Sequence, residues 1–559
     1  MFFKKPLKSF VLRDKIANIA AVLPLIFLSS HLSAQPVFLA SSAADMLPYT
    51  LILIVAFLIL GAVYLISESF VRMEARDLGV DTKKNNFSIL PNSEEVFGSS
   101  KSDGASTSGH KVIHLKKGFD IKLEGAAEYK VDENAAVTRF AMQPKNFIGM
   151  SPIPKVEVEV GDEVQAGDVL FFDKKNPDVK YCAPVSGEVI AVNRGEKRSI
   201  AELVILADKE MKYRAMPVFD LENASKEELV SYMKDNGAWA HIRQRPYNVV
   251  ADSNETPKAI FVSTFDTAPM APDLDIIIAG RGNEFQVGLD ILNMLTPGKV
   301  HLGLNAKDED PSPVFENATG VEKHWISGPH PAGNVGVQIH HIDPINAGER
   351  VWTVGVQDVA TIGSLFLEGI YDAERVVAIT GAELKEPQYV TTYLGANIGD
   401  LVANNLKNDH VRMISGDVLS GKAKKAEQFL DFFDDQVSVI EEGDEYEMFG
   451  WLAPQSARPS LSPTFLSNLV DTSYVANTNT HGERRALVVS DQYEQVLPMD
   501  IYPQHLVKSI LVNDLERMEG LGIYELVEED VALCEFVCTS KQPVQDILRE
   551  GLTTMMDQE

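Results

Sequence analysis

Apolar and polar residues alternate from residue 156 to residue 160, where three valines are separated by two glutamates. A period of two residues predicts a half-buried strand. Gly-Asp pairs at 161–162 and 167–168 divide the next part of the chain, and a second apolar run covers 188–192. Because such pairs favour turns, this region is predicted to be a small domain of short strands.

The two strand regions resemble a barrel-sandwich hybrid, the fold of biotinyl and lipoyl carrier domains, which we expect over residues 112–205. A carrier domain presents one modified lysine at the tip of a hairpin. Asp173-Lys174 imitates the lipoyl pair, but Lys175 and Pro177 do not fit that motif. We therefore predict a solvated basic turn and no modification of Lys174.

Three further apolar runs have the length of strands: Ala259–Val262, Leu274–Ile278 and Val300–Leu304. The second run leads into Gly280, Gly282 and a helical pattern, which predicts a strand–turn–helix unit. The glycine spacing is not Gly-x-Gly-x-x-Gly, and no acidic residue clearly ends the next strand. We therefore expect a Rossmann-like α/β domain over residues 206–380 that binds no nucleotide.

Residues 381–402 combine a strand, a turn at Pro387, a second strand and a short helix. This order predicts a β-grasp module, similar to the soluble-ligand-binding β-grasp (SLBB) domain of redox complexes, over residues 381–480. A hairpin and helical domain is expected over residues 481–559. Helical spacing there predicts two apolar faces, one formed by Leu506, Ile510 and Leu511 and the other by Val544, Ile547 and Leu548.

The N-terminus follows a different pattern. Basic residues precede an apolar run, and Leu32-Ser33-Ala34 offers a small-residue cleavage site, so residues 1–34 are predicted to be a signal-peptide-like segment. Residues 47–66 carry no charge and have the length of a transmembrane helix. Lys and Arg follow this run and are absent just before it, which places the rest of the chain in the cytoplasm. Residues 67–111 are expected to be a flexible linker.

Composition limits the possible functions. The chain has 559 residues, enough for roughly three or four domains. Its net charge of −29 argues against nucleic-acid binding, which needs a basic surface. Three cysteines, at 182, 534 and 538, are too few for a disulfide framework and indicate a reducing compartment for most of the chain.

Histidines at 324, 330, 340 and 341 gather around the Gly- and Pro-rich segment 328–333. Histidine is a common metal ligand. We find no cysteine or acidic residue at ligand spacing in this segment, and its Gly and Pro content is typical of an ordered loop. The sequence therefore predicts no metal site.

Taken together, these segments resemble one family, the NqrA subunits of the bacterial sodium-translocating NADH:quinone oxidoreductase (Na⁺-NQR). The resemblance covers residues 112–559, and the first 110 residues depart from it. The matching blocks are His114–Gly118, Asp173–Pro177, Asn193–Arg198, Gly328–Gly333, Leu497–Ile501 and Glu535–Cys538.

The resemblance implies that the chain is one subunit of a complex that reduces ubiquinone or menaquinone with NADH and exports sodium. It implies that the chain is not catalytic alone. The expected partners are the other subunits of the six-subunit complex, NqrB to NqrF, above all the membrane subunit NqrB, together with the quinone. The implied location is the inner membrane, with a single-pass anchor and the bulk of the chain in the cytoplasm.

The family is also similar to the flavin-binding subunits of respiratory complex I and of Rnf-type complexes, which hold FMN on a glycine-rich loop. Here Trp239 and Ile242 stand in place of glycines, which would block close approach of a phosphate to the backbone. Cys534 and Cys538 cannot supply a four-cysteine cluster. We therefore expect no cofactor on this subunit itself, with FMN, riboflavin, FAD and iron–sulfur groups in partner subunits.

Two segments match quinone-proximal regions of the family. Aromatic rings suit a planar quinone, Ile and Met offer an adaptable apolar lining, and an arginine can donate hydrogen bonds to a quinone oxygen. The same residue types are enriched at subunit interfaces, so an interface is an equal alternative. The candidate residues are Phe147, Ile148, Gly149, Met150, Trp239, Ile242, Arg243, Arg245 and Tyr247.

Two other classes of protein share part of this pattern. A biotin- or lipoyl-type carrier, or a scaffold subunit of another membrane complex, is the main alternative, and a carrier would require a modified Lys174. An efflux-pump adaptor would need long heptad hairpins, and the sequence shows no sustained heptads.

Overall fold

The computed structural model describes residues 111–445, 458–461 and 473–558 apart from 134 and 222, and also residues 55 and 56. The predicted signal-like segment 1–34 lies outside the described residues, as does nearly all of the predicted linker 67–111. Only residues 55 and 56 of the predicted span 47–66 are described. Within the described part of the chain, no helix is both long enough and apolar enough to cross a bilayer.

Two small sheets form the barrel-sandwich hybrid, and their apolar side chains share one core. Leu170, Phe171, Val189 and Leu203 are fully buried in it. The sheet orders are β3-β9-β8-β5 and β4-β6-β7. The strands are β3 (Arg139–Met142), β4 (Lys155–Val156), β5 (Glu163–Val164), β6 (Val169–Phe172), β7 (Lys180–Cys182), β8 (Gly187–Arg194) and β9 (Ile200–Ala207). The strand predicted over 156–160 is shorter than expected, because β4 ends at Val156.

A seven-stranded sheet in the order β1-β14-β13-β12-β15-β10-β11 forms the α/β part. The five strands from β1 to β15 are parallel, and β10 is antiparallel to both of its neighbours. The strands are β1 (Val112–His114), β10 (Arg243–Arg245), β11 (Val249–Val250), β12 (Ala259–Ser263), β13 (Val300–Asn305), β14 (Glu322–Ser327) and β15 (Val351–Thr353).

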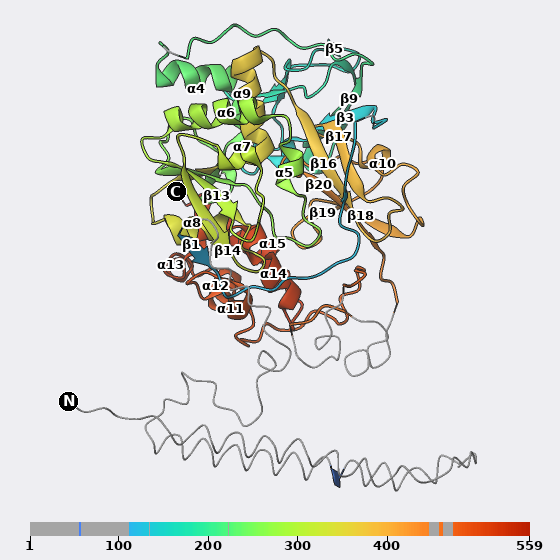
Figure 1. The fold of residues 1–559 in the computed structure, drawn as a ribbon, viewed down its shortest axis with the longest axis vertical. Coiled ribbons are helices and arrows are strands. Elements are labelled where there is room, and N and C mark those ends of the chain that lie inside the picture. The colour runs from blue at the N-terminus through green and yellow to red at the C-terminus, as the bar shows by residue number, and fades with distance from the viewer. Residues whose placement is uncertain are drawn as a thin grey trace, which may run out of the picture. The chain divides into compact units, whose positions relative to one another are not determined.

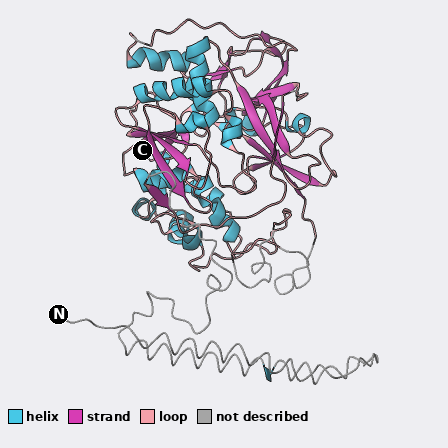
Figure 2. Cartoon of the chain, in the orientation of Figure 1, coloured by secondary structure: helices cyan, strands magenta, loops and turns pink. Residues whose placement is uncertain are grey.

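The helices of this part are α4 (Lys226–Asp235), α5 (Leu274–Ile277), α6 (Gly282–Leu295), α7 (Pro313–Glu316), α8 (Val335–Ile342) and α9 (Val356–Glu368). In Figure 1, α4, α6 and α9 form one group of helices, and Figure 2 shows the strands of the sheet below them. Helices α6 and α9 touch backbone to backbone. A Cβ atom on Gly288 would lie 2.0 Å from the Val359 carbonyl oxygen, and one on Gly363 would lie 1.8 Å from that of Glu284.

Two of the three predicted strands are confirmed, because residues 259–262 and 300–304 lie in β12 and β13. The strand predicted at Leu274–Ile278 is wrong, since these residues form α5. The Asp273 side chain accepts a hydrogen bond from the Asp275 amide at 2.9 Å and begins this helix. An apolar run of only five residues fits either a strand or a buried helical turn.

A six-stranded sheet in the order β19-β18-β20-β16-β17-β2 forms the β-grasp part. Strands β16 and β17 form an antiparallel hairpin, and α10 (Ile398–Leu401) follows it. The second strand and the short helix are confirmed, but the first strand was expected after residue 381 and β16 ends at Thr380. The strands are β2 (Glu128–Asp132), β16 (Glu374–Thr380), β17 (Gln388–Tyr393), β18 (Val411–Ser415), β19 (Lys422–Lys424) and β20 (Gln436–Glu441).

The strand pairings differ from the predicted domain ranges at two places. Within residues 112–205, β1 pairs with β14 of the α/β sheet, and β2 pairs with β17 of the β-grasp sheet. Strand β16 begins before residue 381 and already belongs to the β-grasp sheet. The chain therefore contributes one strand to each of two other sheets before it reaches β3, the first strand of the barrel-sandwich hybrid.

Helices dominate the C-terminal part, as predicted, but no strand lies among the described residues 481–558, where a hairpin was also expected. They are α11 (Tyr493–Val496), α12 (Pro503–Leu511), α13 (Leu515–Gly520), α14 (Glu528–Val537) and α15 (Val544–Met556). Five of the six residues predicted on apolar faces are buried, but Leu511 is 50% exposed, because it lies on the opposite side of the last turn of α12. Cys534 and Cys538 are buried free thiols of this helical core, and the Tyr493 hydroxyl lies 2.9 Å from the Cys538 Sγ.

Candidate functional site

The two segments that the sequence singles out lie next to each other. Residues 147–150 follow the short 3₁₀ helix η1 (Pro144–Asn146), and residues 239–247 run through the 3₁₀ helix η3 (Ala238–His241) into β10. A Cβ atom on Gly149 would lie 3.6 Å from Val249 Cγ1 and 3.9 Å from Met556 Cε. The fold thus brings the first segment against β11 and the end of α15.

Phe433 joins the two segments. The ring of Phe147 lies 5.9 Å from the ring of Phe433, and the Arg243 guanidinium sits 4.8 Å from the centre of the same ring. Phe147 is also 4.9 Å from Phe432 and 4.5 Å from Tyr181. We call Phe147, Arg243 and Phe433 the Phe433 cluster. A cation over an aromatic face is attracted by the ring quadrupole, so the cluster fixes the Arg243 side chain.

Trp239 and Ile242 belong to the protein core and offer no exposed surface beside the Phe433 cluster. Both side chains are fully buried. The Trp239 indole donates a hydrogen bond to the Ala251 carbonyl at 2.7 Å, and its ring meets Trp352 edge-on at 5.4 Å. A buried indole N–H needs such an acceptor, so the arrangement is that of a packed core. These two predicted site residues therefore hold residues 239–247 in place from the core and cannot contact a ligand.

Arg245 and Tyr247 turn towards the C-terminal helices. The buried Arg245 guanidinium forms ion pairs with Asp530 at 3.1 Å and Glu529 at 2.7 Å. Tyr247 is buried, and its ring lies 6.2 Å from Tyr524. Burial raises the pKa of Asp530 to about 6, with Arg245 opposing the rise. Arg245 thus anchors α14 to β10 and has no exposed donor for a ligand.

A buried polar network holds the start of the second segment. The Nδ1 of His241 lies 2.7 Å from the Asp358 carboxylate, which also binds Arg375, and the Tyr371 hydroxyl lies 3.0 Å from His241 Nε2. Burial lowers the pKa of His241. Burial would raise the pKa of Asp358, but Arg375 and His241 outweigh it and hold that pKa below its usual range. A neutral His241 therefore donates from Nδ1 to an ionised Asp358 and accepts from Tyr371.

The predicted residues with exposed surface are thus Ile148, Gly149, Met150 and Arg243, all half-buried or exposed. They combine apolar surface with one guanidinium, which suits either a planar carbonyl compound or a protein partner. Sequence reasoning missed Phe433, Val249 and Met556. The Phe432-Phe433 pair was visible in the chain, but nothing in its spacing places it beside residues 147–150.

The carboxyl ends of β12 and β13 open into a different cavity of about 360 Å³. Ligands of open α/β sheets bind at this edge. Four carboxylates line the cavity: Asp266, Asp273, Asp275 and Asp308. Asp266 is exposed, and burial raises the pKa of the half-buried Asp275 to about 6, so the cavity carries negative charge at pH 7. An anionic phosphate would be repelled here, and Gly280 and Gly282 do not line the cavity.

The histidines that the sequence grouped together have separate partners. His330 Nδ1 lies 3.1 Å from the Thr267 hydroxyl, His340 Nδ1 lies 2.6 Å from Glu525, and His341 Nε2 donates to the Pro498 carbonyl at 2.6 Å. His324 lies 2.9 Å from His301. The expectation that no acidic residue stands at ligand spacing is wrong, because Glu322 and His324 are two residues apart on one strand.

The turn that imitates a lipoyl attachment site has a structural explanation. The buried Asp173 carboxylate accepts hydrogen bonds from the amides of Lys175 at 3.1 Å and Ser151 at 3.2 Å. Asp173 therefore closes the β6–β7 turn on itself, while Lys174 is exposed. The solvated basic turn predicted from the sequence is what the structure contains.

Fold and site define a multidomain protein with a barrel-sandwich hybrid, an α/β sheet whose ligand edge is acidic, and a β-grasp module. Family models match all three: the NqrA N-terminal barrel-sandwich hybrid domain over 113–208, the NqrA second alpha/beta domain over 224–371, and an SLBB-type model, the NQRA C-terminal domain, over 376–426. The chain belongs to the NqrA family of Na⁺-translocating NADH-quinone reductase subunits.

Individual relatives agree with this assignment. The NqrA subunit of the Na⁺-translocating NADH-quinone reductase of Neisseria meningitidis serogroup B is 39% identical over 448 residues, covering 79% of this chain and 99% of that protein. The protein of the same name from Yersinia pestis is 39% identical over 446 residues, with the same coverage. A solved NAD⁺-reducing nickel–iron hydrogenase aligns with a TM-score of 0.29 at 12% identity over 55% of each chain, which is too weak to bear on the fold.

Proposed function

We propose that the chain acts as the NqrA subunit of a Na⁺-translocating NADH-quinone reductase. The observation that carries this proposal is 39% identity across 99% of a relative with that name. The chain is then part of an oxidoreductase and is not catalytic alone. NADH oxidation and sodium transport belong to its partner subunits in this proposal, and the identity supports this role over that of a biotin or lipoyl carrier.

The contribution of this subunit is to help form the place where the quinone is reduced. The exposed edge of Ile148, Gly149 and Met150 supplies apolar surface, and Arg243 supplies a positively charged donor. A quinone oxygen gains negative charge on reduction, so a guanidinium held over Phe433 would stabilise the reduced form. A contact with the membrane subunit NqrB through the same surface is the competing proposal.

The subunit itself holds no flavin, nucleotide or iron–sulfur cluster in this proposal. The acidic cavity at the ligand edge of the α/β sheet disfavours a phosphate. Burial raises the pKa of Cys182 to about 12 and also raises the pKa of Cys534, so neither thiol forms the thiolate that a cluster requires. Flavins and clusters are then held by NqrB to NqrF.

The location follows from the same proposal and from the sequence. Residues 47–66 anchor the chain in the inner membrane, and the part from residue 67 onward lies in the cytoplasm. An anchor of this kind would hold the body of the chain beside NqrB. Protease added to the outside of spheroplasts would then leave that body intact.

Arg243→Gln tests the proposed contribution in the purified complex. Losing a charged hydrogen bond to the reduced quinone is expected to lower kcat/KM for quinone roughly 10-fold or more. Electron transfer from NADH to an artificial acceptor should stay unchanged, and all subunits should co-purify. Arg194→Gln is the matched control, because Arg194 is an exposed arginine of β8.

Three outcomes separate the alternatives. A selective loss of quinone reduction in an intact complex supports the quinone-site proposal. Loss of other subunits from the purified complex would replace it by the interface proposal. If Arg243→Gln keeps wild-type activity and all subunits are present, Arg243 takes part neither in a quinone site nor in a subunit interface.

A further inference from the structure

Strands β13 and β14 bring three side chains of metal-ligand type to one place. His301 on β13 stands opposite Glu322 on β14, and Gly303 stands opposite His324. Registered residues of parallel strands point to the same face, and residues two apart on a strand share a face. A Cβ atom on Gly303 would meet the Gln338 side chain of α8, so this is the face that α8 covers. The register of β13 and β14 therefore brings His301, Glu322 and His324 together.

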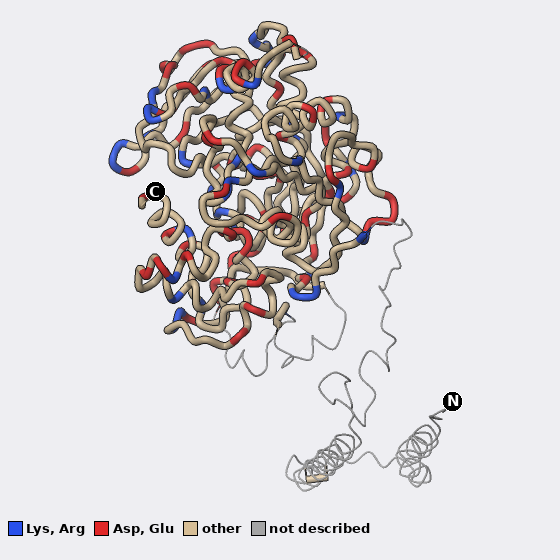
Figure 3. The backbone as a smooth tube through the Cα atoms, turned by 90° about the vertical axis from the view of Figure 1, so that its left-hand side faces the viewer, with Lys and Arg blue, Asp and Glu red and all other residues tan. Residues whose placement is uncertain are grey.

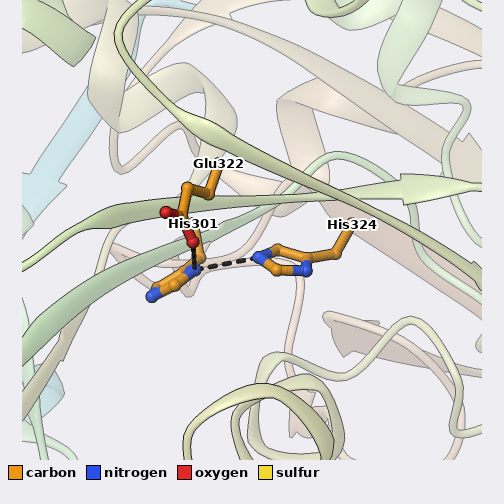
Figure 4. Close-up of side chains that lie close together, drawn as sticks. All are labelled: His301, Glu322 and His324. Carbon is orange, nitrogen blue, oxygen red and sulfur yellow. Dashed lines mark hydrogen bonds and ion pairs between the residues drawn. The ribbon is translucent and has the colours of Figure 1, made fainter. Parts of the chain in front are cut away.

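The donor atoms converge on one nitrogen. His324 Nε2 lies 2.9 Å from His301 Nδ1, and a Glu322 carboxylate oxygen lies 3.8 Å from the same His301 Nδ1. One donor atom from each of the three residues lies within 4.8 Å of the others. Figure 4 shows the Glu322 carboxylate and the His324 ring pointing towards His301 from two sides.

These separations are close to those of a tetrahedral metal site. With metal–ligand bonds of about 2.0–2.1 Å, the donor atoms of a tetrahedral zinc site lie roughly 3.3 Å apart. The observed 2.9 Å and 3.8 Å bracket that value. The third distance, between the Glu322 carboxylate and the His324 ring, is within 4.8 Å, so side-chain rotations would bring the three donors closer to tetrahedral spacing. Two imidazoles and one carboxylate form a ligand set that leaves a fourth position open.

The surroundings hold one ring in place and leave the carboxylate accessible. The His301 ring is stacked on Phe261 with 4.5 Å between ring centres, which fixes its orientation. A metal ion bound here would replace the hydrogen bond between the two rings, because a ring nitrogen that binds a metal carries no proton. The competing partner of Glu322 is Lys299 at 3.6 Å, and both of these side chains are at least half exposed. An exposed pair of this kind contributes little, so the Glu322 carboxylate is available to a cation.

A surface cavity gives access to the group. It has a volume of about 410 Å³ and is lined by His324 together with His341, Trp325, Ile113 and Ile342, among others. His341 is held by its hydrogen bond to the Pro498 carbonyl. His324 lines this cavity, so a water molecule or small ligand that enters it can reach a metal ion bound to His324.

We propose that His301, Glu322 and His324 bind one divalent transition-metal ion, for which Zn²⁺ is the best match. Two imidazole nitrogens and one carboxylate oxygen hold the ion, and solvent fills the fourth position. The ion clamps β13 to β14 near the amino ends of these strands. This site does not depend on the proposed quinone role, since its ligands lie outside the Phe433 cluster and outside the acidic cavity.

The test uses the untagged full-length chain after treatment with a chelator. Zn²⁺ titration by isothermal calorimetry should show one saturable site, and Co²⁺ should give the visible absorption bands of tetrahedral coordination. Glu322→Gln and His324→Ala each remove a ligand, so each should weaken Zn²⁺ binding by more than the roughly 10- to 100-fold that the loss of an outer supporting group costs. His410→Ala should bind like the wild type. His410 is the matched control because it is an exposed histidine paired with a carboxylate, Asp444, at 3.0 Å.

Thermal unfolding provides the second measurement. An ion that binds only the folded chain raises its unfolding temperature, so at one Zn²⁺ concentration the wild type and His410→Ala should be stabilised clearly more than Glu322→Gln. Glu322→Gln keeps the size of an exposed side chain, so it decides the question even if His324→Ala fails to fold. No saturable Zn²⁺ or Co²⁺ binding to the wild type, or equal binding by Glu322→Gln, would overturn the proposal.

Discussion

Two arginines on strand β10 have different roles because their neighbours differ. Arg245 is fully buried and paired with Asp530 and Glu529, so its charge is neutralised inside the protein. Arg243 lies over the Phe433 ring and keeps exposed surface. The sequence presents both as equal candidates for a quinone donor. Only Arg243 has a guanidinium in a position to meet another molecule.

Asp435 is a residue whose surroundings predict a pH effect. Burial raises its pKa to about 7, while Arg375 opposes the rise. An unfolded aspartate has a pKa of about 3.9, so the folded state holds the proton more tightly, and stability falls as pH rises from about 4 to about 7. Asp435→Asn should reduce this fall and raise the unfolding temperature relative to the wild type at pH 8.

Thermal unfolding at pH 5 and pH 8 measures the effect of Asp435→Asn. Some slope will remain, because the pKa values of Asp275, Asp434 and Asp530 are also raised to about 6. A variant whose unfolding temperature falls as steeply with pH as that of the wild type would show that Asp435 ionises normally in the fold.

At the scale of residues, the sequence predicted some surroundings and missed others. The turn at Asp173-Lys174 could be predicted, because a local motif defines it. The burial of Trp239 could not be predicted, because it depends on the folded core. The pairing of Arg245 with Asp530 could not be predicted either, since these two residues are 285 positions apart in the chain. The same holds for His301 and His324, whose contact depends on strand register.

At the scale of elements, helices α6 and α9 show how glycine permits close packing. Gly288 and Gly363 each face a backbone carbonyl of the other helix at a distance that excludes a Cβ atom. Neither glycine has a positive φ, so space and not backbone conformation requires the residue. The helical pattern of α6 was visible in the sequence, but its close partner was not, because periodicity does not identify which helices meet.

Gly363→Ala is therefore expected to destabilise the chain. The added methyl group must push α9 away from α6, and overpacking of this kind costs about 1–3 kcal/mol. The unfolding temperature of the full-length chain should fall measurably. Gly520→Ala is the control, since a Cβ atom on Gly520 would have no neighbour within 4 Å. Equal unfolding temperatures for the two variants would mean that the helices have room to separate.

Element assignment from the sequence succeeded where length or a turn motif settled it. Strand β17, which follows the turn at Pro387, and the C-terminal helices were predicted, but β16 was expected several residues too late in the chain. The run at 274–278 was misassigned because five apolar residues carry too little periodicity. The pairing of β1 and β2 with distant sheets was not predicted, since it depends on contacts over hundreds of residues.

At the scale of the whole molecule, the described strands fall into four sheets, and their order along the chain does not follow the order of the sheets. The first described strand lies in the α/β sheet and the second in the β-grasp sheet. Figure 3 shows acidic and basic positions interspersed along the described chain, in spite of the net charge of −29.

The central claim is that this chain works as the NqrA subunit of a sodium-pumping NADH-quinone reductase. Affinity purification of the tagged full-length chain from membranes, followed by an assay of the purified material, tests it most directly. The expected result is a complex that contains membrane subunits and reduces quinone with NADH at a rate that rises with Na⁺. A chain that purifies alone, or a complex whose NADH-driven quinone reduction ignores Na⁺, would contradict the claim.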